Sequence, residues 1–310
     1  MAKKKKTCSI CQRKDVLLSL PNGFICEECA AQSAEAVLDQ WQQQLQKQFD
    51  VYVSSCSKSK TADEPEPIHQ ARVNGRKLRS LLEFLNVPKK HPLLKTIKKI
   101  HSLLNPIREA DVFLNAFSRR KQTVFQEVSD YVEQDRYKHK KKLQKQLPDL
   151  VEKLKMVEWP SFMQNELPSY ALRIRQRARV QSFEQDFRER VAHYHQTADA
   201  HGKQADISIE ALHKVRIRSK ALRYMYGDLA ERTSRDFSEE EAYFKAIQSQ
   251  FGDINDLQDG LKKLKQYKKK INTPRNETKK AVKKLKKRLA EKVEKVSLKS
   301  EETKQPNQSA

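Results

Sequence analysis

The sequence predicts an all-α protein made of two pseudo-symmetric helical bundles, preceded by a small zinc-ribbon-like module. Three observations lead to this prediction. Apolar residues recur every three or four positions from Ala30 to Val296, which is the period of an amphipathic helix. A charged helical segment occurs twice, which indicates an internal duplication. Six glycines and eleven prolines in 310 residues leave few turns for a β-rich fold.

The charge balance favours a polyanionic partner. The chain carries 63 Lys and Arg against 40 Asp and Glu, a net charge of +23. Folding needs no net charge and like charges repel in a compact state, so such an excess is typical of proteins that attract polyanions. No apolar run approaches the ~20 residues of a membrane span, and no apolar signal segment follows the basic first residues. We therefore expect a cytoplasmic protein without a membrane partner.

Residues 1–31 form the first expected element, a zinc-binding module. It holds two Cys-x-x-Cys pairs, and thiolates at this spacing suit one tetrahedral structural zinc. The expected ligands are Cys8, Cys11, Cys26 and Cys29. Between the pairs, an alternating apolar pattern with an Asn-Gly turn predicts a short β-hairpin. Disulfides or a redox dithiol are disfavoured by the expected cytosolic location and by the lack of a βαβ pattern. Cys56 is expected to be a free thiol without a role.

The helical domain is expected to span 34–296. Three prolines favour a boundary at 148–168, which gives halves of about 34–150 and 168–296. Residues 54–67 read as a polar break, and Leu172 is placed on an inward helix face. Residues 298–310 are polar and are expected to be disordered. In chain order, helices are expected over 30–53, 68–85, 93–104, 108–120, 121–147, 170–196, 209–230, 238–250, 254–269 and 277–296.

The repeated segment places four basic side chains along one side of each of two helices. In both copies the basic positions fall at offsets 0, 3, 7 and 10, an arc of about 80° on a helix. Like charges at this spacing destabilise a helix, so a purpose other than stability should explain two copies. The alternative for the whole set is a solvated helix face. The alternative for the two histidines is a capping or core position. We call these two sets the basic ridges. They are His69, Arg72, Arg76 and Arg79 in the first copy and His213, Arg216, Lys220 and Arg223 in the second.

A second pair of equivalent segments follows each basic helix. Lys98 and Lys245 precede these segments at equivalent distances and are candidate binders too. The segments carry carboxylates, namely Glu109, Asp111, Asp253 and Asp256. These carboxylates are candidate metal ligands, but we favour helix caps or partners that orient Arg108 and neighbouring cations.

These segments resemble the CHAD domain, the conserved histidine α-helical domain. One copy reads His-x-x-Arg-Val-x-x-Arg-Lys-Leu-Arg from His69, and the other reads Leu-His-Lys-Val-Arg-Ile-x-x-Lys-x-Leu-Arg-Tyr from Leu212. An Arg-Glu-x-Asp or a Gly-Asp-x-Asn-Asp turn follows each. The resemblance covers about 34–296. It implies two helical bundles whose basic central surface binds inorganic polyphosphate, often at polyphosphate granules. The eight ridge residues, with Lys98 and Lys245, would be the binders. The cysteine module is not part of the family pattern.

Other functions fit the sequence less well. We expect no enzyme, because a Gly-rich phosphate loop and the Glu-x-Glu-x-Lys strand of triphosphate hydrolases are missing. The alternative is a nucleic-acid-binding protein, which the zinc module and the charge would suit. Against it, Tyr224 and Tyr226 alone supply aromatic rings near the ridges for base stacking. A third hypothesis is an adaptor whose zinc module binds a protein partner while the helices hold a polyanion.

Overall fold

The computed structural model describes residues 7–13, 17–20, 23–61, 63–233 and 235–298. Over these residues the fold is all-α apart from one hairpin, as predicted. The hairpin pairs β1 (Leu17–Leu20) with β2 (Gly23–Cys26) in antiparallel register, Leu17 opposite Cys26. Position 22 of the expected Asn-Gly turn and the tail from 299 lie outside the described residues. No helix in the described part of the chain is long and apolar enough to cross a bilayer.

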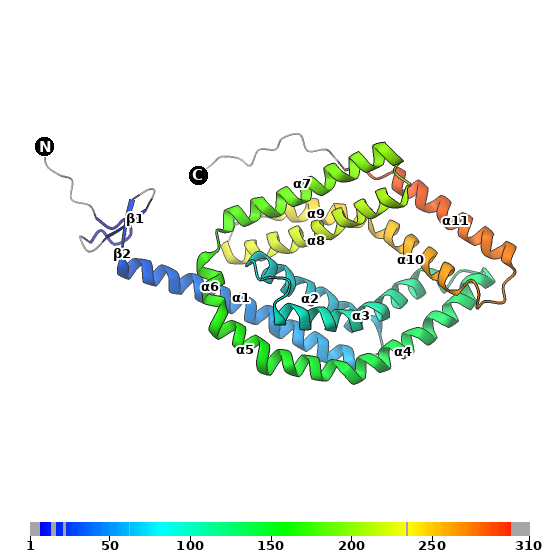
Figure 1. Cartoon of the computed structure of the whole chain (residues 1–310), viewed down its shortest axis with the longest axis horizontal. Coiled ribbons are helices and arrows are strands. Elements are labelled where there is room, and N and C mark those ends of the chain that lie inside the picture. Colours follow the sequence, from blue (N-terminus) through cyan, green and yellow to red (C-terminus); the bar gives the residue numbers. More distant parts are fainter. Residues whose placement is uncertain (1–6, 14–16, 21–22, 62, 234, 299–310) are drawn as a thin grey trace.

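The first half contains two helix pairs. Helix α1 packs against α2, and α3 packs against α4 (Figure 1). The bounds are α1 (Glu27–Thr61), α2 (Pro65–Phe84), α3 (Pro92–Phe117) and α4 (Thr123–Lys153).

Two predicted breaks in this half are wrong. The expected helices 93–104 and 108–120 are one helix, α3, which continues through Pro106 because Leu104 and Ile107 are both buried. The expected polar break from 54 is helical as far as Thr61. There Ser55 and Ser59 are buried, and each hydroxyl donates to a carbonyl one turn back.

The three prolines of 148–168 do not interrupt the helical path. Helix α4 leads into the π-helical turns η1 (Leu154–Glu158) and η2 (Phe162–Glu166), which alternate with α5 (Trp159–Ser161) and α6 (Leu167–Arg173). Pro160 and Pro168 stand in the first turns of α5 and α6, where a missing N–H is tolerated. The path breaks instead at Ile174, which has an extended backbone.

The second half repeats the arrangement of the first. Its helices are α7 (Gln176–His201), α8 (Asp206–Thr233), α9 (Ser238–Gln250), α10 (Gly252–Tyr267) and α11 (Arg275–Glu294). Helix α7 packs on α8 as α1 packs on α2, and α10 packs on α11 as α3 packs on α4. The expected helix 170–196 is therefore two helices, α6 and α7. Leu172, expected to face inward, is 50% exposed beside the break.

The two halves meet through their repeated elements. Helix α2 contacts α8, and α3 contacts α10, so both basic ridges lie at the centre of the molecule (Figure 1). One continuous cluster of buried apolar side chains runs through both halves, from Trp41 and Phe84 to Phe183 and Tyr267. The cysteines near the amino terminus form a separate small cluster.

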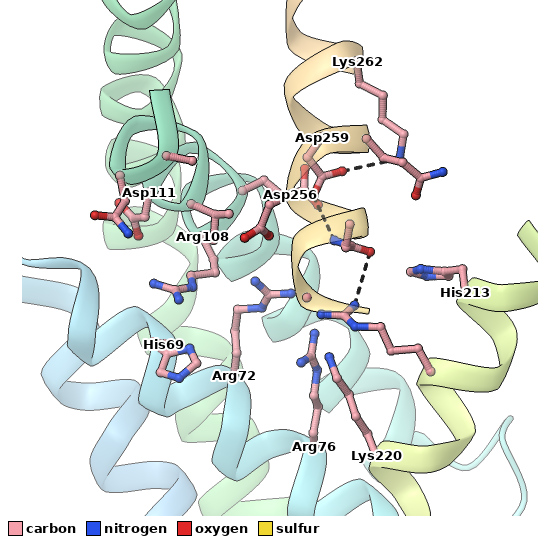
Figure 2. A pocket seen from close by; sticks show the side chains of 18 of the residues that line it. His69, Arg72, Arg76, Arg108, Asp111, His213, Lys220, Asp256, Asp259 and Lys262 are labelled. Carbon is pink, nitrogen blue, oxygen red and sulfur yellow. Dashed lines mark hydrogen bonds and ion pairs between the residues drawn. The ribbon is translucent and has the colours of Figure 1, made fainter. Parts of the chain in front are cut away.

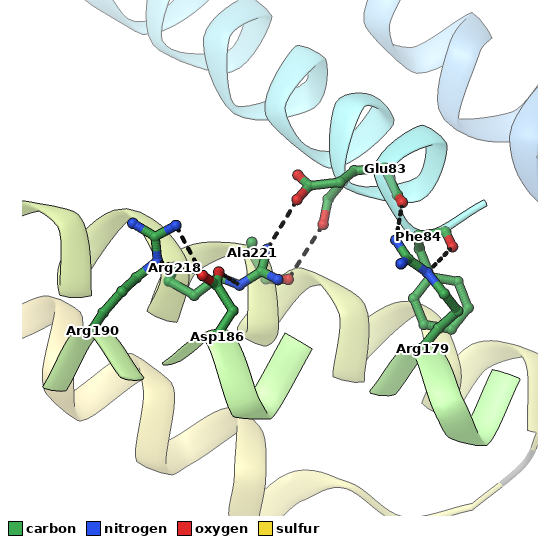
Figure 3. Close-up of polar contacts among 8 residues, drawn as sticks. Glu83, Phe84, Arg179, Asp186, Arg190, Arg218 and Ala221 are labelled. Atoms are coloured by element: carbon green, nitrogen blue, oxygen red, sulfur yellow. Dashed lines mark hydrogen bonds and ion pairs between the residues drawn. The ribbon is translucent and has the colours of Figure 1, made fainter. Parts of the chain in front are cut away.

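Polar contacts fix the carboxyl end of α2 to the second half (Figure 3). Arg179 of α7 donates from Nε to the Phe84 carbonyl at 3.0 Å and from Nη2 to the Glu83 carbonyl at 2.6 Å. Arg218 of α8 pairs with the Glu83 carboxylate at 3.0 Å and with Asp186 at 2.6 Å. The last carbonyls of a helix lack the usual partner within the helix, and the Arg179 guanidinium donates to two of them.

Candidate functional site

A pocket of about 1060 Å³ opens between α2, α3, α8 and α10 (Figure 2). Both repeated helices contribute the basic residues that the sequence singled out. The three residues of α2 and the three of α8 occupy equivalent positions, so the two copies face one shared space. These lining residues are His69, Arg72, Arg76, His213, Arg216 and Lys220.

Three of these cations make no ion pair, although the charge of Glu109 acts on Arg72 from a greater distance. No Asp or Glu oxygen of the described residues lies within 4.0 Å of the head-group nitrogens of Arg72, Arg76 or Lys220. All three side chains are partly buried. Burial first, and the other cations second, lowers the pKa of Arg72 to about 10 and that of Lys220 to about 7. Positive charge is therefore concentrated where Arg72, Arg76 and Lys220 meet, while carboxylates line other parts of the same pocket.

The two halves are electrically coupled across the pocket. After burial, the charge on Arg76 of the first half is the largest cause that lowers the pKa of Arg216 in the second. Arg76 and Arg72 also lower the pKa of Lys220. Cations of both copies thus act on one another, and an anion placed between them would relieve repulsion from both sides.

The histidines stand at the edge of this positive field. His69 is half-buried and His213 is exposed, so neither belongs to the core. Desolvation by the surrounding protein, together with neighbouring guanidinium groups, lowers the pKa of each. For His69 the main charged neighbour is Arg108, and for His213 it is Arg216. Both imidazoles are therefore neutral near pH 7 in the free protein, and a bound anion would favour their protonated form.

Arg216 is held by a short chain of polar contacts. Its Nη1 donates to Asn255 Oδ1 at 3.2 Å, and Asn255 Nδ2 donates to Asp259 Oδ2 at 3.1 Å. Asp256 lies on the same helix, and burial together with Asp259 raises its pKa. One wall of the pocket is therefore acidic and positions a cation of the opposite wall.

Two of the four predicted carboxylates, Asp111 and Asp253, pair with cations and do not cap helices. Asp111 lies within α3, where its Oδ1 accepts from Arg136 Nε at 2.6 Å. Asp253 accepts from Lys292 Nζ at 2.5 Å. The cap position of α10 is Phe251, which makes no side-chain cap bond. The favoured role of orienting cations is correct for these two aspartates, although the cations are not Arg108.

Four predicted binders lie outside the pocket. Arg79 and Lys98 are exposed and do not line it. Arg223 and Lys245 line a separate hollow of about 750 Å³ together with Lys77. The fourth ridge position is rotated about 60° from the third and lies one turn further along the helix, so it points past the pocket.

The structure adds Arg108 and Lys262 to the basic lining. Arg108 occupies the position in the first copy that Asn255 occupies in the second. A search for residues shared by both copies therefore passes over it. In the sequence, Arg108 stands within the acidic segment, and that position indicates only a cation that the neighbouring carboxylates orient.

The four amino-terminal cysteines come together as expected. One sulfur from each residue lies within 4.8 Å of the others, and Cys8, Cys26 and Cys29 are buried. Cys11 Sγ and Cys26 Sγ are 3.7 Å apart, so the thiols are not bonded to each other. Four sulfurs at these separations fit one tetrahedral metal ion. Cys56 is fully buried in the helical core, which raises its pKa to about 12 and makes it inert.

The architecture is that of a duplicated helical domain whose central pocket brings together cations of both copies. The CHAD domain family model matches residues 43–265, and the chain belongs to this family. The crystal structure of the CHAD domain from the plant Ricinus communis has a TM-score of 0.57 and 18% sequence identity to this chain. The match covers 84% of this chain and 92% of the plant chain, which shows a shared fold. No curated protein in the comparison matches the sequence.

Proposed function

We propose that this protein binds inorganic polyphosphate in the central pocket, as a binding protein and not an enzyme. The observation that carries the proposal is the convergence of Arg72, Arg76 and Lys220 without a carboxylate partner within 4.0 Å. Guanidinium groups donate two hydrogen bonds at once to phosphate oxygens, and a chain of phosphates presents such oxygens continuously. Membership of the CHAD family, which is linked to polyphosphate, supports the same ligand.

The lining of the pocket argues against nucleic acid as the main ligand. Its residues include no Phe, Tyr or Trp, so bases would find no ring on which to stack. Nucleic acid would have to bind through its phosphates alone. A polyphosphate chain has more charge per length and no bases to accommodate, so it fits this lining better.

The test is a competition between long-chain polyphosphate and single- or double-stranded DNA at physiological salt. We expect polyphosphate to displace DNA at a lower phosphate concentration. The double variant Arg72→Ala with Arg76→Ala should lose at least about tenfold in polyphosphate affinity, because each charged hydrogen bond contributes about 1.5–3 kcal/mol. The control is Lys286→Ala with Lys287→Ala, which removes two exposed charges of α11 outside the pocket. Equal losses in both variants, or DNA that competes equally per phosphate, would contradict the proposal.

We propose further that the four clustered cysteines hold one structural zinc ion. Three of the sulfurs are buried against each other, and backbone N–H groups point at two of them. Ile10 N lies 3.4 Å from Cys8 Sγ, and Cys29 N lies 3.4 Å from Cys26 Sγ. Such N–H groups favour thiolates, which are the ligands that zinc prefers. Four protein ligands leave no position for a substrate, so the ion would stabilise the module only.

A further inference from the structure

Lys220 is an amine placed inside an anion-attracting pocket. It projects from α8, and Figure 2 shows its head group beside that of Arg76, both directed into the pocket. Among the described residues, its Nζ has no hydrogen bond and no carboxylate oxygen within 4.0 Å. Nothing therefore holds this nitrogen in its charged form.

The charges that surround Lys220 oppose its protonation. Arg216 and Arg223 lie on its own helix, and Arg72 and Arg76 face it from α2. The α10 carboxylates Asp256 and Asp259 raise the pKa of Arg216, and the largest charge effects on Lys220 come from the four arginines. Together with burial, these neighbours lower the pKa of Lys220 to about 7. A large fraction of this amine is then neutral and nucleophilic at physiological pH.

We propose that Lys220 is a self-acylation site for small acyl phosphates. The guanidinium groups of Arg76 and Arg216 would hold the phosphate end of the reagent. The neutral Nζ attacks the carbonyl carbon, so an N–C amide bond forms while the bond from that carbon to the phosphate oxygen breaks. Inorganic phosphate leaves, and the proton lost from nitrogen passes to the phosphate or to water. The same guanidinium groups stabilise the charge on the leaving phosphate.

Acylation would alter the pocket in two ways. It removes the positive charge of Lys220, and it adds an uncharged acyl group where a phosphate would bind. The fraction of molecules that bind the polyanion with the original affinity should therefore fall as the acylated fraction rises. The acylation itself depends only on anion attraction and on the amine, so it does not require polyphosphate to be the natural ligand.

The experiment treats the full-length protein with isotope-labelled acetyl phosphate at pH 7.5 and follows each lysine by peptide mass spectrometry. The matched control is Lys214, which is exposed on the same helix and pairs with Glu210 at 3.1 Å. We expect Lys220 to be acetylated about tenfold faster than Lys214. The Lys220 rate should level off about one pH unit above its pKa of about 7, because its amine is then mostly neutral.

The expected factor follows from two opposing effects. At pH 7.5 roughly three-quarters of an amine with a pKa of about 7 is neutral, against about one in a thousand for an ordinary lysine. A weaker base is also a weaker nucleophile. With a Brønsted slope of about 0.4–0.5, the value known for thiols, the lower pKa reduces the reactivity of the neutral Lys220 amine roughly thirtyfold. An advantage of about tenfold or more remains.

Inorganic phosphate and polyphosphate separate the two proposals. Millimolar phosphate should slow the acetylation of Lys220 and leave Lys214 unchanged, because it occupies the anion site. A Lys220 rate no higher than that of Lys214, or one that phosphate does not slow, would overturn this inference. Acetylation that phosphate blocks and polyphosphate does not would support the inference and contradict the proposed function.

Discussion

Gly75 occupies a position on α2, between Arg72 and Arg76, where a side chain has no room. A Cβ added there would lie 2.6 Å from the Tyr52 ring and closer still to His101 Nε2. Tyr52 belongs to α1 and His101 to α3, so the glycine lets three helices approach one another directly behind the pocket wall.

Gly75→Ala should therefore lower the free energy of unfolding. Alanine gains about 1 kcal/mol of helix propensity over glycine, but overpacking a core costs about 1–3 kcal/mol, and here two rings must shift. We expect a net loss of up to about 2 kcal/mol in denaturant unfolding. The control is Gly252→Ala, where no atom lies within 4 Å of the added Cβ. Equal stability of the two variants would show that the helices can separate without cost.

His101 makes the stability of the first half depend on pH. Its ring is 5% exposed, and burial, aided by Arg79 and Arg76, lowers its pKa to about 3. Between pH 6.5 and 3 the unfolded chain binds this proton and the folded chain does not, so acidification destabilises the fold. The contribution reaches about 1.4 kcal/mol per pH unit.

His101→Gln should flatten this dependence. The variant removes the titrating group, so its free energy of unfolding should fall less steeply between pH 6 and 4 than that of the wild type. Comparing slopes removes the contribution of the carboxylates, which titrate in both proteins. Parallel slopes would mean that His101 is protonated in the folded state.

Repetition in the sequence predicted the residues that the two copies share, and little else of the pocket. His69, Arg72 and Arg76 and their second-copy equivalents were found because the same residue types recur at the same offsets. Arg108 was missed because its equivalent is Asn255, so nothing repeats there. Arg79 and Arg223 share the helical arc but not the pocket, since a helical projection does not contain the packing of neighbouring helices.

At the scale of elements, prolines predicted helix breaks that the structure does not have, because buried apolar side chains hold the helix together around them. Pro106 lacks an N–H and costs an isolated helix about 3 kcal/mol. Leu104 and Ile107 on either side are completely buried, and together they offset about that amount. Along the path from α4 to α6, π-helical turns take up the irregularity instead. Neither the burial nor the turns can be read from the proline positions alone.

The contacts of Arg218 give an element-scale prediction. This guanidinium is 11% exposed and joins α8 to both α2 and α7 through Glu83 and Asp186. Arg218→Ala should cost about 1.5–3 kcal/mol of unfolding free energy, the range for hydrogen bonds to charged groups.

Arg190→Ala is the control for this prediction. Arg190 contacts the same Asp186 at 3.0 Å, but within one helix and at a more exposed position. We expect a loss of at most about 0.5 kcal/mol. Unfolding in urea measures both variants, and similar losses would show that the contact between the halves adds no stability.

At the scale of the whole molecule, the duplication correctly predicted two halves with their ridges at one shared groove. The structure shows that α2 and α8 contact each other. The periodicity of the sequence predicts that each helix has an apolar face, but it does not predict which helix that face contacts. The amino-terminal module was predictable for a different reason. Four thiols at fixed spacing leave few alternatives, whereas a helix face has many possible partners.

Metal removal should affect the module and spare the helical domain. The purified protein should contain about one zinc per chain, and Cys26→Ser with Cys29→Ser should abolish it. Because the cysteine cluster is separate from the main core, helical content and polyphosphate affinity should change little in that variant. Circular dichroism and binding measurements test this. Metal-free wild-type protein, or loss of helix on metal removal, would contradict it.

The junction between module and domain contains no linker. Cys29 lies in the first turn of α1, and the same helix runs on to Trp41, which is buried in the core (Figure 1). The module therefore sits at a set distance and a set azimuth from the pocket. Each residue inserted into the exposed stretch between Cys29 and Trp41 would move it about 1.5 Å outward and swing it about 100° around the axis. Helical phase, rather than tether length, thus decides which way the module faces.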